Sequence, residues 1–257
     1  MTNIKSLNNS IAKAFNLLDY FNTTKPEWGV RELAKEIGAN KSTTYRMLAT
    51  MESLGVLRKD QGSEKYSLGL KLFELGNRVS IQSAFVSQTH PVLEQVAAEI
   101  TETVHLGILK DSQVFMVDKI ESPKGLKLNS VVGTSSPAYC SGLGKTLMAH
   151  LSDFDLSQTL KKIEFKANTE FTITKKTILK KELEEIRTLG YAIDRQELEL
   201  GLICVAVPVF NQNDQVIAAL SAAGPAIRFQ EEKIKNYVAI LQNGANAIKQ
   251  RIGDFQL

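Results

Sequence analysis

Apolar residues recur with helical spacing near the start of the chain. Residues 6–22 carry a stripe at i, i+3, i+4, i+7 and i+10, typical of a helix that packs on its neighbours: Ile11, Ala14, Phe15, Leu18 and Phe21. A second, short helix is expected around Leu33, Ala34 and Ile37, because these positions share one helical face. Gly38 should end that helix, since glycine readily adopts positive φ.

A third helix should begin after Asn40, a residue type that commonly caps helix N-termini. Its inner face is expected to hold Leu48, Met51 and Leu54, whereas its first turn is polar. Two helices joined by a tight turn, the second opening with hydrogen-bonding side chains, are typical of a helix-turn-helix that contacts base edges of DNA. The same pattern also fits an ordinary helical hairpin whose polar residues face solvent.

Residues 56–68 predict two short strands around a turn at Gln61-Gly62-Ser63. A hairpin directly after the second helix of a helix-turn-helix is a wing. Arg58, Lys59 and Lys65 would place cations beside the phosphates of DNA. The wing therefore favours DNA binding over the plain hairpin. Trp28, the only tryptophan, is expected to be a packing residue rather than a base-stacking one.

The rest of the chain mixes helices and strands. Helices are expected over 70–84 and 85–101, with a break or kink at Pro91. Further strands are expected at 103–109, 114–120, 126–130, 204–210 and 216–222, and helices at 142–150, 155–162, 177–189 and 230–252. Strands paired mostly as hairpins, with helices between them, indicate an α+β fold whose second domain is sensor-like and has a central antiparallel sheet.

This pattern divides the chain into three parts. We predict a winged helix-turn-helix DNA-binding domain at 5–69, a helical linker at 70–88 and an α/β effector-binding domain at 89–255. The length of 257 residues and a 43% hydrophobic content are enough for two modest domains with proper cores. The linker could carry contacts between subunits.

Composition bears on the cellular location of the protein and on its need for metals or cofactors. No apolar run approaches the roughly 20 residues of a membrane helix, and the N-terminal residues carry no apolar signal core, so a cytoplasmic protein without membrane contact is expected. Cys140 and Cys204 have no CxxC spacing, and only three histidines accompany them. Neither a metal site, a disulfide nor a cofactor is therefore expected.

The positive charge lies in the predicted DNA-binding domain. Residues 1–75 hold 11 Lys or Arg and eight Asp or Glu, an excess equal to the net charge of +3 of the whole chain. This bias is mild, so one domain alone should bind DNA weakly, and useful affinity would come from two domains on two half-sites.

Two stretches of the second domain could hold a ligand. The sequence Gly142-Leu-Gly-Lys-Thr146 is not a phosphate-binding loop, because the required first glycine is Tyr139. Backbone N–H groups of Ser141–Gly144 at a helix start could still hold a small anion, although the small residues could equally serve close packing. Asp194, followed by Glu197 and Cys204, could accept a hydrogen bond from a ligand hydroxyl or cap a turn.

Catalysis finds little support in the sequence. None of the histidines stands near a plausible nucleophile, and no carboxylate pair is placed as a general acid and base. The apolar setting of Cys204 should raise the pKa of its thiol. The chain is therefore expected to bind a ligand without turnover, and not to be an enzyme.

Several stretches, taken in order, resemble the IclR family of bacterial transcription regulators over nearly the whole chain. They are residues 31–38, 41–48, 66–69, 138–145, 190–192 with Asp194 and Glu197, 205–209, and 221–225. The resemblance implies a winged helix-turn-helix, a helical linker and a GAF-like α/β effector-binding domain with an antiparallel sheet. It also implies homodimers or dimers of dimers (homotetramers) that bind double-stranded DNA at palindromic operators and respond to organic, aromatic or sugar acids. Most members repress transcription and some activate it.

The predicted helix-turn-helix and wing assign roles to single DNA-binding residues, and the resemblance assigns the residues of the effector site. Ser42, Thr43, Thr44 and Arg46 would read bases, Lys41 and Tyr45 would contact phosphate or sugar, and Lys59 and Lys65 would hold the wing on the DNA backbone. The effector would be bound by Leu126, Gly142, Leu143, Asp194, Leu202, Cys204 and Ser221. Ala223 stands where carboxylate-binding relatives place a second serine, which argues against a glyoxylate-like or pyruvate-like ligand and leaves a larger acid or a sugar acid.

Two other functions remain open at this point. One is a metabolic enzyme with an appended DNA-binding module, in which Asp194, Glu197 and Cys204 would carry the chemistry. The other is a constitutive architectural DNA-binding protein whose second domain is structural. Neither the effector, the operator nor the sign of regulation follows from the sequence.

Overall fold

The computed structural model of the chain describes residues 9–22, 24–78, 80–124 and 128–253. The protein divides into two compact units, residues 1–80 and 81–257. No helix of the described residues is long and apolar enough to cross a membrane.

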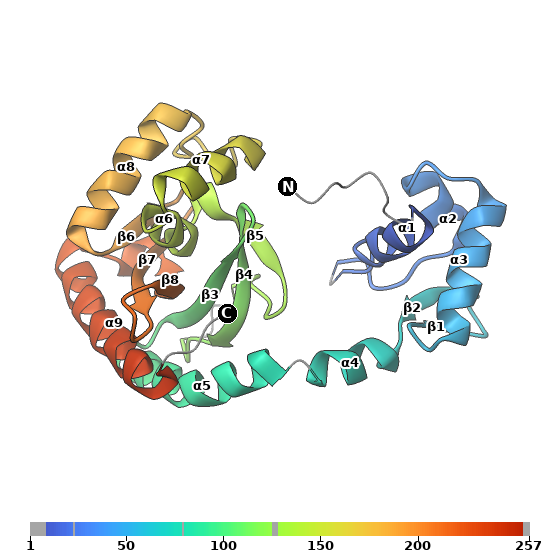
Figure 1. Ribbon diagram of the computed structural model, residues 1–257, viewed down its shortest axis with the longest axis horizontal. Helices are drawn as coiled ribbons and strands as arrows, with labels where there is room; N and C mark the ends of the chain where they lie inside the picture. Colours follow the sequence, from blue (N-terminus) through green and yellow to red (C-terminus); the bar gives the residue numbers. More distant parts are fainter. Residues whose placement is uncertain (1–8, 23, 79, 125–127, 254–257) are drawn as a thin grey trace. The chain divides into compact units, whose positions relative to one another are not determined.

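The first unit consists of three helices followed by a hairpin and a fourth helix (Figure 1). Its elements are α1 (Asn9–Leu18), α2 (Val30–Glu36), α3 (Lys41–Ser53), β1 (Leu57–Lys59), β2 (Tyr66–Leu68) and α4 (Leu70–Asn77). Strands β1 and β2 pair antiparallel, which confirms the predicted hairpin. Trp28 is buried in the core of this unit, and its indole N–H donates to the carbonyl oxygen of Tyr20 at 2.8 Å. It is therefore a packing residue, as predicted.

The face that α1 buries differs from the predicted stripe. Phe21 is buried and Ala14 and Leu18 pack against the same core, as predicted. Ile11 and Phe15, however, are 56% and 66% exposed, and Leu17 is buried instead. Leu54, predicted on the inner face of α3, is 63% exposed because it lies in the turn after the helix, whereas Leu48 and Met51 are buried as expected. Spacing along one helix defines a face, but the neighbouring elements decide which residues are covered.

The second unit contains one six-stranded antiparallel sheet with the strand order β5-β4-β3-β8-β7-β6. The strands are β3 (Thr103–Lys110), β4 (Gln113–Ile120), β5 (Ser135–Pro137), β6 (Ala192–Arg195), β7 (Leu202–Phe210) and β8 (Val216–Pro225). Residues 128–134 form no strand, so the strand predicted at 126–130 is wrong for its described part. The edge strand β5 lies a few residues further on and pairs with β4.

Helices cover both faces of this sheet (Figure 1). Helices α5 (Ser80–Ile100) and α9 (Glu231–Ile252) pack on one face, and α6 (Gly142–Ala149), α7 (Asp153–Lys162) and α8 (Lys176–Leu189) lie over the other. Helix α5 continues through Pro91, where a break or kink was predicted. Gly190 ends α8 with φ +76°, as its position after the helical pattern predicts.

Candidate DNA-binding face and ligand cavity

The turn between α2 and α3 is defined by one backbone conformation and one hydrogen bond. Gly38 adopts φ +63°, a conformation that side chains with a Cβ rarely take. The side chain of Asn40 then caps α3 by accepting a hydrogen bond from the Thr43 N–H at 2.9 Å. Leu33 of α2 and Leu48 of α3 are fully buried between the helices. The first turn of α3 is thus presented on a rigid two-helix frame.

One face of α3 carries exposed polar side chains. Lys41, Ser42, Tyr45 and Arg46 are exposed, and positions i, i+1, i+4 and i+5 lie on the same side of a helix. The hydroxyl of Ser42 lies 3.0 Å from the Oδ1 atom of Asn40. Thr43 is half-buried at the edge of this face. Cationic and hydroxyl groups at the start of such a helix are those that contact base edges and phosphates.

Thr44 does not belong to this face. Its side chain is fully buried, and its hydroxyl donates to the backbone carbonyl oxygen of Asn40 at 3.1 Å. A base-reading role for Thr44 is therefore wrong, because the side chain points into the helix pair. Thr44 directly follows polar residues of the first turn in sequence, but its position on the helix faces the core of the first unit.

The wing places its predicted cations in different settings. Lys59 forms an ion pair with Glu64 across the hairpin, and its Nζ atom lies 5.9 Å from the ring centre of Tyr66. Lys65 is exposed near the hairpin tip. The backbone of Tyr66 exchanges two hydrogen bonds of 2.9 Å with that of Trp28, which anchors β2 to the segment before α2. Lys65 is the wing lysine that can reach a phosphate without first breaking an ion pair in the described structure.

A cavity of about 240 Å³ lies in the second unit, between the sheet and the N-terminus of α6. It brings together residues that are far apart in sequence, from all six strands of the sheet, α6 and the loops at 128–134 and 198–199. Of the residues predicted to bind an effector, Leu143, Asp194, Leu202, Cys204 and Ser221 line it. Ala223 lines it as well.

The two other predicted residues differ from this group. Gly142 packs behind the cavity, where an added Cβ would lie 3.0 Å from the Sγ atom of Cys204 and 3.1 Å from its carbonyl oxygen. Glycine at this position therefore serves close packing between α6 and β7. Leu126 lies outside the described residues.

The polar groups on the inner wall of the cavity are buried, and most of them are neutral. The Ser221 hydroxyl is buried, and no hydrogen-bond partner for it lies within the described structure. The Nε2 atom of His105 lies 2.8 Å from the Ser130 hydroxyl, and burial, helped by the charge of Lys119, lowers the pKa of His105 to about 3. Burial raises the pKa of the Cys204 thiol to about 12, as its apolar surroundings predict. Neither ring nor thiol is charged at neutral pH.

Asp194 is the carboxyl group of the cavity wall. Its Oδ1 atom accepts a hydrogen bond from the Glu197 N–H at 2.7 Å, so it caps the turn after β6 and also faces the cavity. Burial raises the pKa of Asp194 to about 7. The position of Asp194 is therefore compatible both with capping a turn and with accepting a hydrogen bond from a ligand hydroxyl.

Sequence reasoning missed two features of this site. His105 was regarded only as a strand residue, and its place on the cavity wall depends on the pairing of β3 with β8, in which it faces Ser221. Lys145 is fully buried and forms ion pairs with Glu182 and Glu197. The sequence around Lys145 contains a glycine pattern, but nothing near Lys145 in sequence predicts its two ion-pair partners, which lie 37 and 52 residues away.

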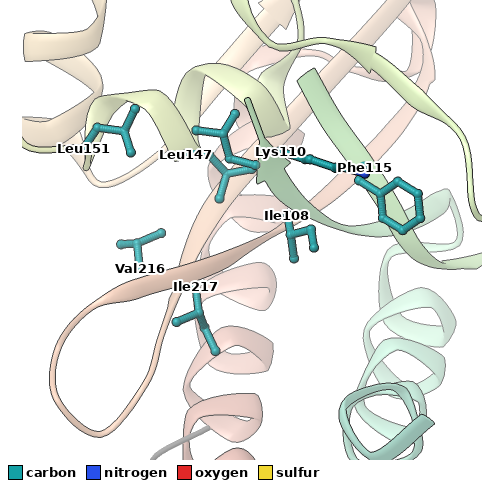
Figure 2. A pocket seen from close by; sticks show the side chains of 8 residues that line it. Ile108, Lys110, Phe115, Leu147, Leu151, Val216 and Ile217 are labelled. Atoms are coloured by element: carbon teal, nitrogen blue, oxygen red, sulfur yellow. The ribbon is translucent and has the colours of Figure 1, made fainter. Parts of the chain in front are cut away.

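A second cavity lies at the other end of β3 (Figure 2). The pairing of β3 with β8 ends at Gly107 and Ala219, and beyond this point the two strands separate. Figure 2 shows Leu147 approaching from α6, with Ile108 and Ile217 on the two strands. The lining is apolar except for Lys110, so this cavity lacks the buried hydroxyl and carboxyl groups of the first.

Comparison with known proteins identifies the class to which these two units belong. Residues 10–61 match the IclR helix-turn-helix domain, and residues 80–250 match the C-terminal domain of the bacterial transcriptional regulator IclR. The chain is 38% identical over 244 residues to the HTH-type transcriptional regulator KdgR of Escherichia coli, covering 95% of this chain and 92% of that protein. It is 27% identical over 241 residues to the transcriptional repressor IclR of E. coli, covering 93% and 88%.

A solved structure shows the same fold. An IclR homologue from Microbacterium hydrocarbonoxydans in complex with 4-hydroxybenzoate superposes with a TM-score of 0.82 at 23% identity, covering 95% of this chain and 98% of that one. The protein is thus a helix-turn-helix transcriptional regulator with a C-terminal α/β domain built on an antiparallel sheet. It belongs to the IclR family. Its relatives are named as regulators rather than enzymes, which confirms the expectation that it is not an enzyme.

Proposed function

We propose that this regulator is a repressor that binds a palindromic operator through α3 and its wing, and releases it when a small organic acid occupies the cavity of the second unit. The proposal rests on the presence of two features in one chain. The first unit has an exposed polar face on α3, and the second unit has a cavity in which the Ser221 hydroxyl is buried without a hydrogen-bond partner in the described structure. Burying such a hydroxyl costs free energy that a bound ligand recovers. The repressor name of one relative supports the direction of control.

The size and lining of the cavity favour a small, hydroxylated or aromatic acid. Its volume of about 240 Å³ is below the roughly 300–1,000 Å³ of typical drug-sized sites. The relative that binds 4-hydroxybenzoate supports an aromatic acid. Ala223, in place of a second serine, removes a hydroxyl donor that a very small keto acid would need. Organic, aromatic and sugar acids are therefore the ligand classes to test.

Residues 5–69 would act as the DNA-binding domain, 70–88 as the linker and 89–255 as the effector-binding domain. Two such chains would pair, and two pairs could join into a tetramer. Exposed apolar side chains in the first unit support association: Phe15 is 66% exposed and Leu70 is 80% exposed. Pairing would bring two weakly basic domains onto one palindrome.

The test uses fluorescent DNA from the region upstream of the gene, at fixed salt, with and without pyruvate, 4-hydroxybenzoate and gluconate. Release of the DNA by one acid is the expected result, because an effector shifts the equilibrium only if it binds the two states with different affinity. Tight binding that no acid changes would favour a constitutive DNA-binding protein. Tighter binding with an acid would favour an activator or a co-repressed regulator.

Variants separate the two sites. Ser42→Ala combined with Arg46→Ala should lose operator affinity and still bind the acid. Ser221→Ala should keep operator affinity and lose response to the acid, whereas Ile217→Ala in the second cavity should keep both. Intact operator binding by the α3 double variant would contradict the assignment of α3, and a lost response in Ile217→Ala alone would move the effector to the second cavity.

A further inference from the structure

A buried cluster of charges lies directly behind the wall of the ligand cavity. The Lys145 ammonium, carried by α6, forms ion pairs with Glu182 of α8 and Glu197 after β6, and donates a third hydrogen bond to the Ile193 carbonyl oxygen at 3.0 Å. Asp194 follows Ile193 and is 1% exposed. Its link to the cluster is the 2.7 Å hydrogen bond from the Glu197 backbone.

Negative groups outnumber positive ones in this cluster. Glu197 and Glu182 contact the single ammonium of Lys145, and Asp194 joins them through its hydrogen bond with the Glu197 backbone. Three ionised carboxylates would leave an excess of two negative charges in a largely buried space. The Oε2 atom of Glu197 is buried and has no hydrogen-bond partner in the described structure. Uncompensated buried charge is costly, and such groups take up a proton instead.

The other titratable groups near Asp194 are less well placed to give that proton to a ligand. Burial also raises the pKa of Glu197, but Glu197 is ion-paired with Lys145 and does not line the cavity. His105 of β3 and Cys204 of β7 stay neutral at pH 7 for the reasons given above, and burial also raises the pKa of Cys140 to about 12. Lys145 stays charged, because Glu197 and Glu182 raise its pKa against the effect of burial. Glu199 lines the outer part of the cavity and is exposed. Among the described residues that line the cavity there is no lysine or arginine.

We propose that the cavity binds a carboxylate ligand together with one proton, which Asp194 holds so that its carboxylic acid donates a hydrogen bond to the carboxylate of the ligand. The inference rests on the proposed function, since it specifies how an acid can enter a cavity whose wall already carries a carboxyl group. The proton comes from solvent and converts Asp194 from a repelling anion into a donor. The Ser221 hydroxyl and the N-terminal end of α6 supply further stabilisation.

Affinity should therefore depend on pH in a defined direction. Burial raises the pKa of Asp194 to about 7, so the protonated form that binds the ligand predominates below neutral pH and is lost above it. The ligand carboxylate stays ionised throughout this range. Kd should be nearly constant at low pH and should rise about tenfold for each pH unit above the pKa of Asp194.

Calorimetric titration of the 257-residue protein with pyruvate, 4-hydroxybenzoate and gluconate tests this dependence. For any acid that binds, Kd should be roughly tenfold higher at about pH 8 than at about pH 6. In buffers of different ionisation enthalpy, close to one proton should be taken up per ligand at the higher pH. Equal Kd and no proton uptake would overturn the inference and leave the proposed function intact, whereas no binding of any acid at either pH would overturn both.

Asp194→Asn provides the matched variant, because the asparagine amide donates a hydrogen bond at every pH. It should bind the acid with the same Kd at both pH values and without proton uptake. His105→Asn, whatever its affinity, should keep the pH dependence of the parent protein. Operator binding and a thermal melt check that each variant is folded. Proton uptake that persists in Asp194→Asn would overturn the assignment to this residue.

Discussion

Lys145 is a buried cation whose role in stability can be measured at the scale of one residue. Replacing it with methionine would leave Glu182 and Glu197 near each other without the ammonium between them. Breaking a buried ion pair by removing one partner typically costs about 3–5 kcal/mol. Lys145→Met should therefore lower the free energy of unfolding by about that amount, as measured by urea denaturation followed by circular dichroism.

The control for this measurement is Lys180→Met, an exposed lysine of α8. Its effect should stay within about 0.5 kcal/mol, as for most surface substitutions. A loss in Lys145→Met no larger than that of the control would show that the cluster adds nothing to stability. Part of the loss should disappear at low pH, because burial raises the pKa of Glu197 and its protonated form no longer needs the cation.

The cap of α3 connects stability with DNA binding at the scale of one element. Asn40→Ala removes the acceptor of the Thr43 N–H, a change that costs about 1 kcal/mol in typical helices. The first turn of α3 should fray, so its amides should exchange faster with solvent and operator affinity should fall. Asn40→Ser keeps a side-chain acceptor at the cap without adding a negative charge beside the DNA, and should keep both properties. Unchanged amide exchange in Asn40→Ala would mean that packing alone holds this turn.

Elements with local signals could be predicted from the sequence, and those defined by distant partners could not. Gly38, Asn40 and Gly190 act within a few residues of their own position, and the helix ends they predict are present. The buried face of α1 was predicted only in part, because which of its residues are covered depends on elements that follow it in the chain. The cavity combines segments separated by more than 100 residues. The sequence itself indicated Asp194 and the start of α6, but that Leu202, Cys204 and Ser221 meet them in one cavity followed only from the family resemblance.

At the scale of the whole molecule, affinity for DNA should depend on joining two weakly basic domains. The charge excess of +3 over residues 1–75 and the few exposed cations of α3 and the wing allow only a few phosphate contacts per domain. Linking two such domains can raise affinity by about 10²–10⁴-fold without a new contact. The gain exists only where both half-sites lie on the same face of the duplex.

Operator variants test this dependence without any change to the protein. DNA with one half-site should bind about 10²–10⁴-fold more weakly than the palindrome. Inserting about five base pairs between the half-sites turns one of them to the opposite face of the duplex and should cause a similar loss. Inserting about ten base pairs restores the face and should recover part of the affinity. Equal affinity for one half-site and for the palindrome would mean that each DNA-binding domain binds alone. An effector in the second unit would then have to change the DNA-binding face itself, because the spacing of two domains would not affect affinity.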